Sequence, residues 1–356
     1  MEKKRFDLPD RIDSLQALRF LGAMCITVYH FSGLQGSCPF DFSHAVYLFY
    51  MISGFVVMLS TRKIDKKRRF LSRRLVRILP LYWGLTVFTF AAGQFFPSIV
   101  GYRPTAAQLV CSLFFIPFSR MTAKAGTAIR PLVGLGHTLQ MEMLFYVLFL
   151  IAMRLNHKYR GFIAACFAFA VAMIGYVFPT DNPVLHFYTA NPYVWTSFIV
   201  GLAVYGVFSL MSAKRIEYRS GLIPILISAA VVTGLAVPAF LRKVSVWYDI
   251  ALFTAVLICA LVYSACGKKT PYPVVKLGNI SYSYYLLHYY TITLATHFFA
   301  LDSLTIRNIA IAVLICTITW GISWISWYFI EHEFTMWLSS RFHLTDNRNK
   351  YRKENA

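Results

Sequence analysis

The sequence predicts an all-α polytopic integral membrane protein, with about ten transmembrane helices packed in one bundle. Of its 356 residues, 58% are hydrophobic and only 14% are charged, and the mean hydropathy is +0.56. A soluble domain of this size cannot bury so much apolar surface. The net charge is +20 at pH 7, but the basic residues lie in short segments between apolar runs, where they orient spans. This distribution argues against nucleic acid as a partner and indicates a lipid bilayer.

Ten apolar runs are long enough to cross a bilayer as helices. They cover residues 14–34, 43–61, 78–97, 135–153, 161–179, 193–211, 220–240, 248–266, 278–300 and 306–330. A further run at 107–118 is short and is interrupted by Gln108, Ser112 and Pro117. We expect it to lie at the membrane surface or to re-enter the bilayer, within an outer loop of residues 98–134.

The basic residues set the orientation of the chain. If 107–118 does not span, 27 of the 35 Lys and Arg residues fall on one side, in residues 1–13, 62–77, 154–160, 212–219, 267–277 and 331–356. The positive-inside rule makes that side cytoplasmic. We therefore expect both termini in the cytoplasm and a multi-pass location in the inner (plasma) membrane of the cell. Residues 1–333 form a single transmembrane domain, and the basic tail 334–356 is expected to be disordered and cytoplasmic.

The first run carries two residues that are costly in hydrocarbon, Arg19 and His30. Their separation of 11 residues corresponds to about 16 Å of helix rise and about 20° of rotation, so both lie on one face. A structural role is open to each, with Arg19 reaching the membrane interface and His30 bonded to a neighbouring helix. Two such residues on one face favour a functional role.

The fourth run carries Glu142 about seven residues, or roughly 10 Å, from its outer end. This depth matches the depth expected for His30, so we expect the carboxylate and the imidazole to pair. A histidine held by a carboxylate can take a proton from a hydroxyl. A structural Glu–His or Glu–Tyr bond between helices would satisfy the sequence equally.

The densest basic segment, residues 62–77, leads into the third run. Its first part, Arg62 to Arg69, fits topology and contact with anionic lipid. Arg73 and Arg77 lie four residues apart and therefore share a helical face, with Tyr82 following in the span. Arginines clustered there suit a phosphorylated ligand that arrives from the cytoplasm.

Smaller motifs occur in three other runs. Ser53 and Gly54 lie in the middle of the second run, where small residues allow helices to approach closely. His288 lies near the middle of the ninth run among tyrosines, and the tenth run closes with Glu331 and Glu333. Each motif alone favours packing over catalysis. The seven cysteines are scattered without a CxxC pair, so we expect neither a disulfide framework nor a metal site.

Together these residues resemble the membrane acyltransferase-3 family of sugar and glycopolymer O-acyltransferases. Six motifs match in order over nearly the whole chain: Arg19 with His30, FYMISGF, RRLVRILPLYW, HTLQMEMLFY, LGNISYSYYLLH and IEHEF. The segments SLQALRFLGA and TLQMEMLFY are most similar to the corresponding segments of exopolysaccharide acetyltransferases. Two positions depart from the family, His137 in place of Trp and Glu333 in place of Pro. The first bears on the acceptor pocket and the second on the end of a helix.

The resemblance implies an enzyme that moves an acyl group, usually acetyl, from cytoplasmic coenzyme A to a sugar hydroxyl beyond the membrane, in lipopolysaccharide, exopolysaccharide or a similar polymer. It implies no metal. The nucleotide end of acetyl-CoA would be held by Arg73, Arg74, Arg77 and Tyr82. His30 would be the general base or would carry the acyl group, Arg19 would stabilise negative charge, and Glu142 would orient His30. The acceptor would be contacted by His137, Tyr285 and His288.

The competing class is a transporter, or a flippase of a lipid-linked sugar or small anionic solute, in which intramembrane charges line a pathway. The sequence shows no inverted repeat, and the basic cytoplasmic cluster favours a phosphorylated donor. The acceptor sugar, the length of the acyl group, direct transfer against an acyl-histidine intermediate, and the oligomeric state stay open.

Overall fold

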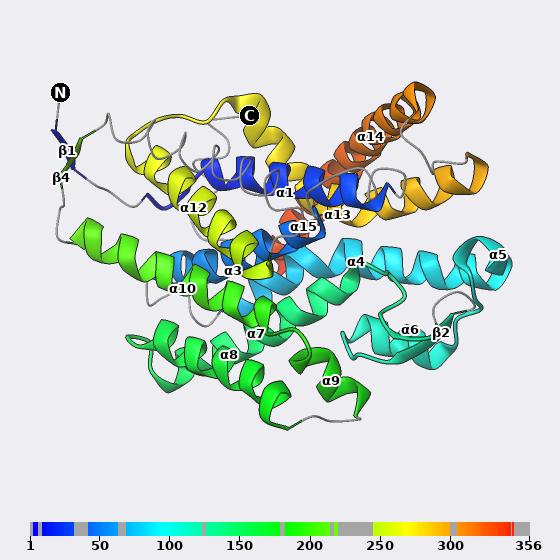
Figure 1. The fold of residues 1–356 in the computed structure, drawn as a ribbon, viewed down its shortest axis with the longest axis horizontal. Helices are drawn as coiled ribbons and strands as arrows, with labels where there is room; N and C mark the ends of the chain where they lie inside the picture. The colour runs from blue at the N-terminus through cyan, green and yellow to red at the C-terminus, as the bar shows by residue number, and fades with distance from the viewer. Residues whose placement is uncertain are drawn as a thin grey trace.

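The computed structural model describes residues 3–5, 9–31, 42–62, 69–122, 126–178, 182–213, 217–219, 245–299, 305–342 and 344. These residues form a bundle of long helices (Figure 1). The long helices are α1 (Ser14–His30), α3 (Val46–Ser60), α4 (Phe70–Phe95), α7 (Gly136–Leu155), α8 (Arg160–Val177), α10 (Pro192–Ala213), α12 (Val246–Ala265), α13 (Tyr272–Phe298) and α14 (Ile306–Ser326). The predicted all-α architecture is confirmed for the described residues, apart from two short strand pairs.

Short elements connect and extend the long helices. The helical ones are η1 (Phe42–Ala45), α5 (Pro97–Val100), α6 (Ala106–Leu113), α9 (Pro183–Thr189), the π-helical η3 (Trp327–Phe334) and α15 (Thr335–Arg341). Strand β1 (Lys3–Arg5) pairs antiparallel with β4 (Glu217–Arg219), and β2 (Ser119–Thr122) pairs antiparallel with β3 (Gly126–Ile129). The N-terminal strand therefore lies beside the segment that follows α10.

Within the described residues, seven helices are long and apolar enough to cross a membrane. They correspond to η1 with α3, to α4, α7, α8, α10 and α12, and to the continuous helix Ile306–Arg341. Two further predicted spans form α1 and α13, but α1 has only 17 residues and α13 is more polar. The predicted span 220–240 lies outside the described residues. A multi-pass membrane protein is thus supported, while the number ten and the position of the termini stay predictions.

The ambiguous run 107–118 forms no spanning helix. It contributes α6, which has eight residues and rises only about 12 Å. Thr105 starts this helix through a capping box with Gln108, in which each side chain bonds the other's backbone N–H. The prediction that this run does not cross the membrane as a helix is confirmed.

Small residues allow two pairs of helices to approach closely. A Cβ atom at Gly54 or Gly201 would collide with the backbone of the facing helix, so α3 and α10 pack at near-backbone contact. The same holds for α1 and α13, where a Cβ atom at Gly278 would collide with the backbone of Gln16. The expectation that Gly54 permits a close helix approach is confirmed.

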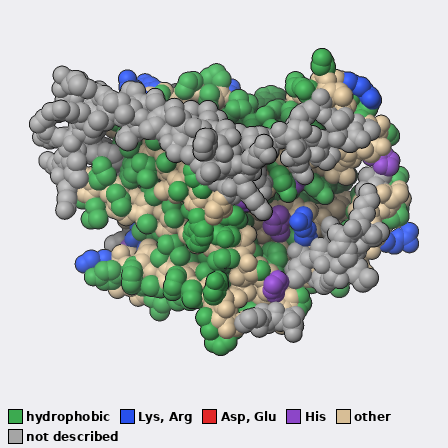
Figure 2. Space-filling view, in the orientation of Figure 1, with side chains coloured by type: hydrophobic (Ala, Val, Ile, Leu, Met, Phe, Trp, Pro, Cys, Tyr) green, Lys and Arg blue, Asp and Glu red, His purple; other side chains and the backbone are tan. Residues whose placement is uncertain are grey.

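The outer face of the bundle is apolar. Figure 2 shows hydrophobic side chains spread over one face with few basic side chains among them. On α8 the exposed side chains include Phe162 and Phe169, and on α14 they include Val313 and Leu314. Large apolar residues exposed in this way on long helices suit contact with lipid tails.

The C-terminal helix extends further than the sequence suggests. A disordered tail was expected from residue 334, whereas η3 continues without a break into α15 and the helix ends at Arg341. The Thr335 hydroxyl donates to the carbonyl of Val76 at 3.4 Å, which anchors α15 against α4. This correction applies to residues 334–341, because residues 343 and 345–356 lie outside the described part of the chain.

Candidate active site

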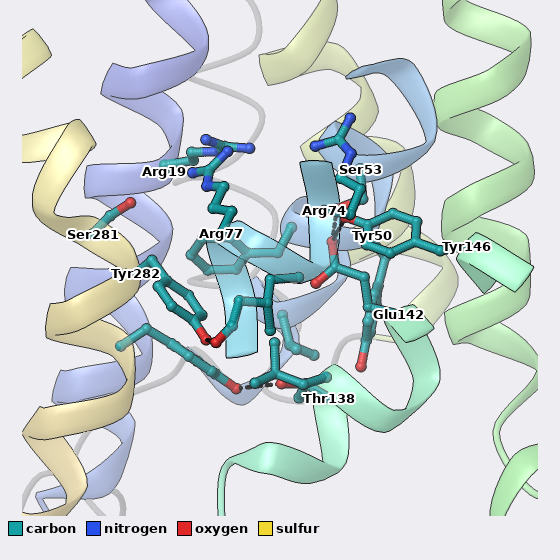
Figure 3. A pocket seen from close by; sticks show the side chains of 15 residues that line it. Arg19, Tyr50, Ser53, Arg74, Arg77, Thr138, Glu142, Tyr146, Ser281 and Tyr282 are labelled. Carbon is teal, nitrogen blue, oxygen red and sulfur yellow. Dashed lines mark hydrogen bonds between the residues drawn. The ribbon is translucent and has the colours of Figure 1, made fainter. Parts of the chain in front are cut away.

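A pocket lies inside the bundle, where five helices distant in sequence meet (Figure 3). It holds about 760 Å³ of empty space, its opening included. Helices α1, α3, α4, α7 and α13 supply its walls. The lining residues are Arg19, Val46, Phe49, Tyr50, Ser53, Arg74, Arg77, Ile78, Thr138, Leu139, Glu142, Tyr146, Ser281, Tyr282 and Tyr285.

Three guanidinium groups converge at one end of this pocket. Figure 3 shows the guanidinium groups of Arg19 of α1 and Arg77 of α4 together at one end, with that of Arg74 at the same end but apart from them. Arg74 is held by a 3.2 Å hydrogen bond to the Ser60 hydroxyl, and its guanidinium lies 5.4 Å from the ring centre of Tyr146. Like charges collected in a bundle interior repel one another unless an anion lies between them, so this end of the pocket would suit an anionic ligand.

Glu142 supplies the negative charge in the pocket lining. Its carboxylate accepts hydrogen bonds from the hydroxyls of Ser53 and Tyr146. Among the described residues, no ion pair within 4.0 Å joins it to the three lining arginines. The carboxylate is thus fixed by neutral donors and leaves the guanidinium groups available to a ligand.

The expected pairing of Glu142 with His30 is wrong in this structure. Among the described residues, no hydrogen bond or ring contact joins the two, and His30 does not line the pocket. The physical reason is depth. His30 lies near enough to His137, at the start of α7, to interact with it electrostatically. Glu142 lies five residues, or roughly 8 Å, further along α7.

Two of the predicted donor-binding residues lie away from the pocket lining. Helix α4 turns Arg74 and Arg77 toward the pocket, and the 100° step between neighbours turns Arg73 aside. Tyr82 is fully buried, donates to the carbonyl of Ser112 at 3.0 Å and stacks on Phe115 at 4.6 Å. The structure therefore places Tyr82 where it fastens the α6 segment to α4.

His30 belongs to a second cluster, at the end of α1 that lies opposite Arg19. Its ring centre lies 5.3 Å from that of His288 and 5.6 Å from that of Tyr289. The charges of Arg130 and His137 act on it. His137 is itself held by a 2.9 Å contact between its Nδ1 and the carbonyl of Gly134. The structure thus brings together His30, His137 and His288, which the sequence assigns to catalysis and acceptor binding.

Tyr285 lies between the arginine pocket and the histidine cluster. It lines the pocket, and its hydroxyl is 3.0 Å from the hydroxyl of Thr138. On the other side, its ring centre lies 5.9 Å from that of His288. A ligand held by the arginines is therefore separated from His30 by the layer that contains Tyr285.

Several residues in or near the pocket were not singled out from the sequence as site residues. Ser53 was interpreted as a packing residue, although it bonds Glu142. Glu331 was given a packing role, yet its carboxylate accepts from the backbone N–H and hydroxyl of Ser283 and is acted on by the charges of Arg77 and Arg19. One signal was available. Lining residues recur at three- and four-residue spacing on each helix, as in Val46, Phe49, Tyr50 and Ser53.

Comparison with known proteins identifies the family of the chain. The family model described as "Acyltransferase domain" matches residues 12–328, which include every helix that lines the pocket. The chain is 28% identical, over 258 residues, to the "Exopolysaccharide production protein ExoZ" of Rhizobium meliloti (strain 1021), and the match covers 69% of this chain and 75% of that protein. No solved structure matches the chain. With most of its length matched by this model and its site assembled from the matched helices, the chain belongs to the acyltransferase family and is a multi-pass membrane acyltransferase.

Proposed function

We propose that this acyltransferase moves an acetyl group from acetyl-CoA to a hydroxyl of a cell-surface polysaccharide. The observation that carries the proposal is the pocket in which three arginines from two helices converge inside a matched acyltransferase domain. The name of the Rhizobium relative supports an exopolysaccharide as the acceptor class. Lipopolysaccharide offers the same hydroxyl chemistry and is the alternative acceptor.

The arginine end of the pocket suits the phosphates of coenzyme A. Guanidinium groups give paired N–H donors that match phosphate oxygens, and they stay charged when partly buried. Below the arginines the lining turns apolar, with Phe49, Ile78 and Leu139, which suits the pantetheine arm. Arg73 adds positive charge on the same helix without lining the pocket.

The distance along α1 suits a donor that binds at one end and reacts at the other. Arg19 and His30 are separated by about 16 Å of helix rise, a span that the extended arm of coenzyme A bridges. The thioester would then pass the Tyr285 layer and reach His30. Arg19 remains with the donor, and Glu142 keeps the pocket side chains in place through Ser53 and Tyr146.

In the transfer, the acceptor oxygen attacks the thioester carbonyl carbon while its proton passes to His30. The carbon–sulfur bond then breaks, the acetyl group stays on the sugar oxygen, and the coenzyme A thiolate leaves and takes the proton back from His30. His137 and Tyr285 would line the approach of the acceptor to His30. Direct transfer needs no acyl-histidine intermediate, because the hydroxyl and the thioester meet at one imidazole.

The orientation follows from charge. The positive-inside rule puts the basic segment 62–77, and with it the arginine end of the pocket, on the cytoplasmic side of the inner membrane, where acetyl-CoA is available. The histidine cluster then faces the acceptor beyond the membrane. An enzyme oriented in this way needs no export of coenzyme A.

The direct test uses purified protein in lipid nanodiscs, radiolabelled acetyl-CoA and deacetylated polysaccharide from the host. We expect label in the polymer that mild alkali releases as acetate, and loss of the O-acetyl signal in polysaccharide from cells that lack the gene. Binding of acetyl-CoA without transfer to any host polymer, together with unchanged polysaccharide in the deletion strain, would overturn the proposal.

A further inference from the structure

His288 is the most deeply buried titratable residue of the histidine cluster. Its side chain, on α13, has no exposed surface, and its Nδ1 lies 3.1 Å from the carbonyl oxygen of Tyr284. A carbonyl only accepts hydrogen bonds, so Nδ1 carries the proton in the neutral ring. The lone pair of the ring is therefore on Nε2.

That Nε2 atom is buried and has no hydrogen-bond partner among the described residues. Buried acceptors are rarely left unpaired, because an unpaired acceptor loses its bond to water and gains nothing in return. Such an atom beside a proposed reaction centre points to a donor that arrives during the reaction.

The ring of His30 is placed to supply this donor. The two ring centres lie 5.3 Å apart with their planes tilted by 46°. An N–H···N bond between two imidazoles puts the ring centres about 5 Å apart. A turn of the His30 ring is thus enough to form the bond, without movement of either helix.

Two other polar groups of this region are already hydrogen-bonded, and a third is a cation. The Tyr285 hydroxyl is bonded to Thr138, and Nδ1 of His137 is bonded to Gly134. Arg130 is a cation and cannot accept a hydrogen bond. When His30 takes a proton it has two N–H groups, and the lone pair of His288 is the acceptor that can stabilise the second one.

We propose that His288 is a positioning residue for His30: its Nε2 accepts the N–H of His30 and so presents the other ring nitrogen, as a lone pair, to the acceptor hydroxyl. This inference rests on the proposed function, and it gives His288 the orienting role that the sequence assigns to Glu142. Because Nδ1 of His288 keeps its proton and donates it in a hydrogen bond to the Tyr284 carbonyl, His288 accepts a hydrogen bond at Nε2 and does not take the proton of the acceptor hydroxyl itself.

Two substitutions separate this role from simple packing. His288→Phe keeps a planar ring but removes the acceptor, whereas His288→Gln places an amide oxygen where Nε2 stands. We expect His288→Phe to lower kcat about 100-fold, the scale of a displaced general base, with KM for acetyl-CoA unchanged. His288→Gln is expected to stay within about tenfold of the wild type. His297→Gln, at the exposed end of the same helix, is the matched control and keeps full activity.

A second readout does not depend on turnover. In protein labelled with ¹⁵N-histidine, the ring nitrogens of His30 should show one fixed tautomer in the wild type and in His288→Gln, and a mixture in His288→Phe. If His288→Phe does not give a monodisperse protein, His288→Met removes the acceptor with a flexible apolar chain and takes its place.

The outcomes separate this inference from the proposed function. A wild type that transfers no acetyl group defeats the proposed function, while the tautomer of His30 still decides the role of His288. An active wild type with an equally active His288→Phe defeats only the role of His288. Equal losses in His288→Phe and His288→Gln, with normal binding of acetyl-CoA, would also overturn it, because an acceptor at the Nε2 position would then not matter.

Discussion

Arg74 and Arg77 are three residues apart on α4, and both line the pocket, whereas Arg73, next to Arg74, and the exposed Arg69 do not. This difference allows two double variants that lose the same net charge to be compared, one inside the pocket and one outside it. The double variant Arg74→Ala/Arg77→Ala should weaken binding of acetyl-CoA at least about tenfold, because each lost charge-assisted hydrogen bond is worth about 1.5–3 kcal/mol. Isothermal titration in nanodiscs measures the change.

The control is Arg69→Ala/Arg73→Ala, which removes the same charge from the same helix. We expect a smaller loss of affinity there, because screened charges outside the pocket act only at long range. Equal losses in the two double variants would mean that the segment attracts the donor by its overall charge and that the pocket does not bind it.

His30 and Glu142 lie in different parts of the site, so substitutions at the two positions should affect turnover to different extents. His30→Gln removes the basic nitrogen but keeps a polar side chain of similar reach, and it should lower kcat about 10²–10⁴-fold without changing the Kd of acetyl-CoA. Glu142→Gln keeps an acceptor for Ser53 and Tyr146 and should cost less turnover. Single-turnover transfer and equilibrium binding, measured side by side, check both statements.

A reversed order, with Glu142→Gln the more damaging to turnover, would make Glu142 the base. A His30→Gln protein that is folded and turns over normally would return His30 to a structural role.

At the scale of the helices, α1 and α13 form the contact on which both ends of the site depend. Arg19 and His30 come from α1, while Tyr285 and His288 come from α13, and Gly278 lets the two helices approach. Gly278→Leu should therefore separate the helices, lower thermal stability and abolish binding of acetyl-CoA. Unfolding followed by tryptophan fluorescence, with a binding assay, measures these effects.

Gly321→Leu is the matched control, because a Cβ atom at Gly321 meets nothing within 4 Å. We expect it to behave as the wild type. If Gly278→Leu also binds the donor normally, the close approach of α1 and α13 is not needed for the pocket.

The sequence predicted the helices better than their relative depths. Apolar length placed nine described helices correctly, because length and hydropathy are local properties. The depth argument failed for His30 because the level of α1 relative to α7 depends on how the helices pack, which apolar length does not reveal. The same limit explains Arg73, since four-residue spacing identified a shared face but not which face of α4 meets the pocket.

At the scale of the molecule, the orientation in the membrane is still a prediction. We expect a cysteine at Arg103 to be labelled from outside the cell by a membrane-impermeant maleimide, and a cysteine at Lys158 to be labelled only after permeabilisation. Both positions are exposed in loops, and the positive-inside rule puts them on opposite sides. A protein without native cysteines provides the background.

The opposite labelling pattern would place the arginine pocket outside the cell and remove its access to acetyl-CoA. The motifs could indicate the family from the sequence, but not this geometry. That Arg19, Arg74, Arg77 and Glu142 would share one pocket depends on how five helices meet, which no local pattern contains.

The contact between α1 and α13 also has a consequence in time. Gln16 meets Gly278, which the ribosome reaches roughly 260 residues later, about 13 to 52 s at 5–20 residues per second. Through that interval Arg19 sits in a membrane helix whose covering partner does not yet exist. We therefore expect nascent α1 to stay with the insertion machinery. We also expect that an incomplete chain does not react with acetyl-CoA.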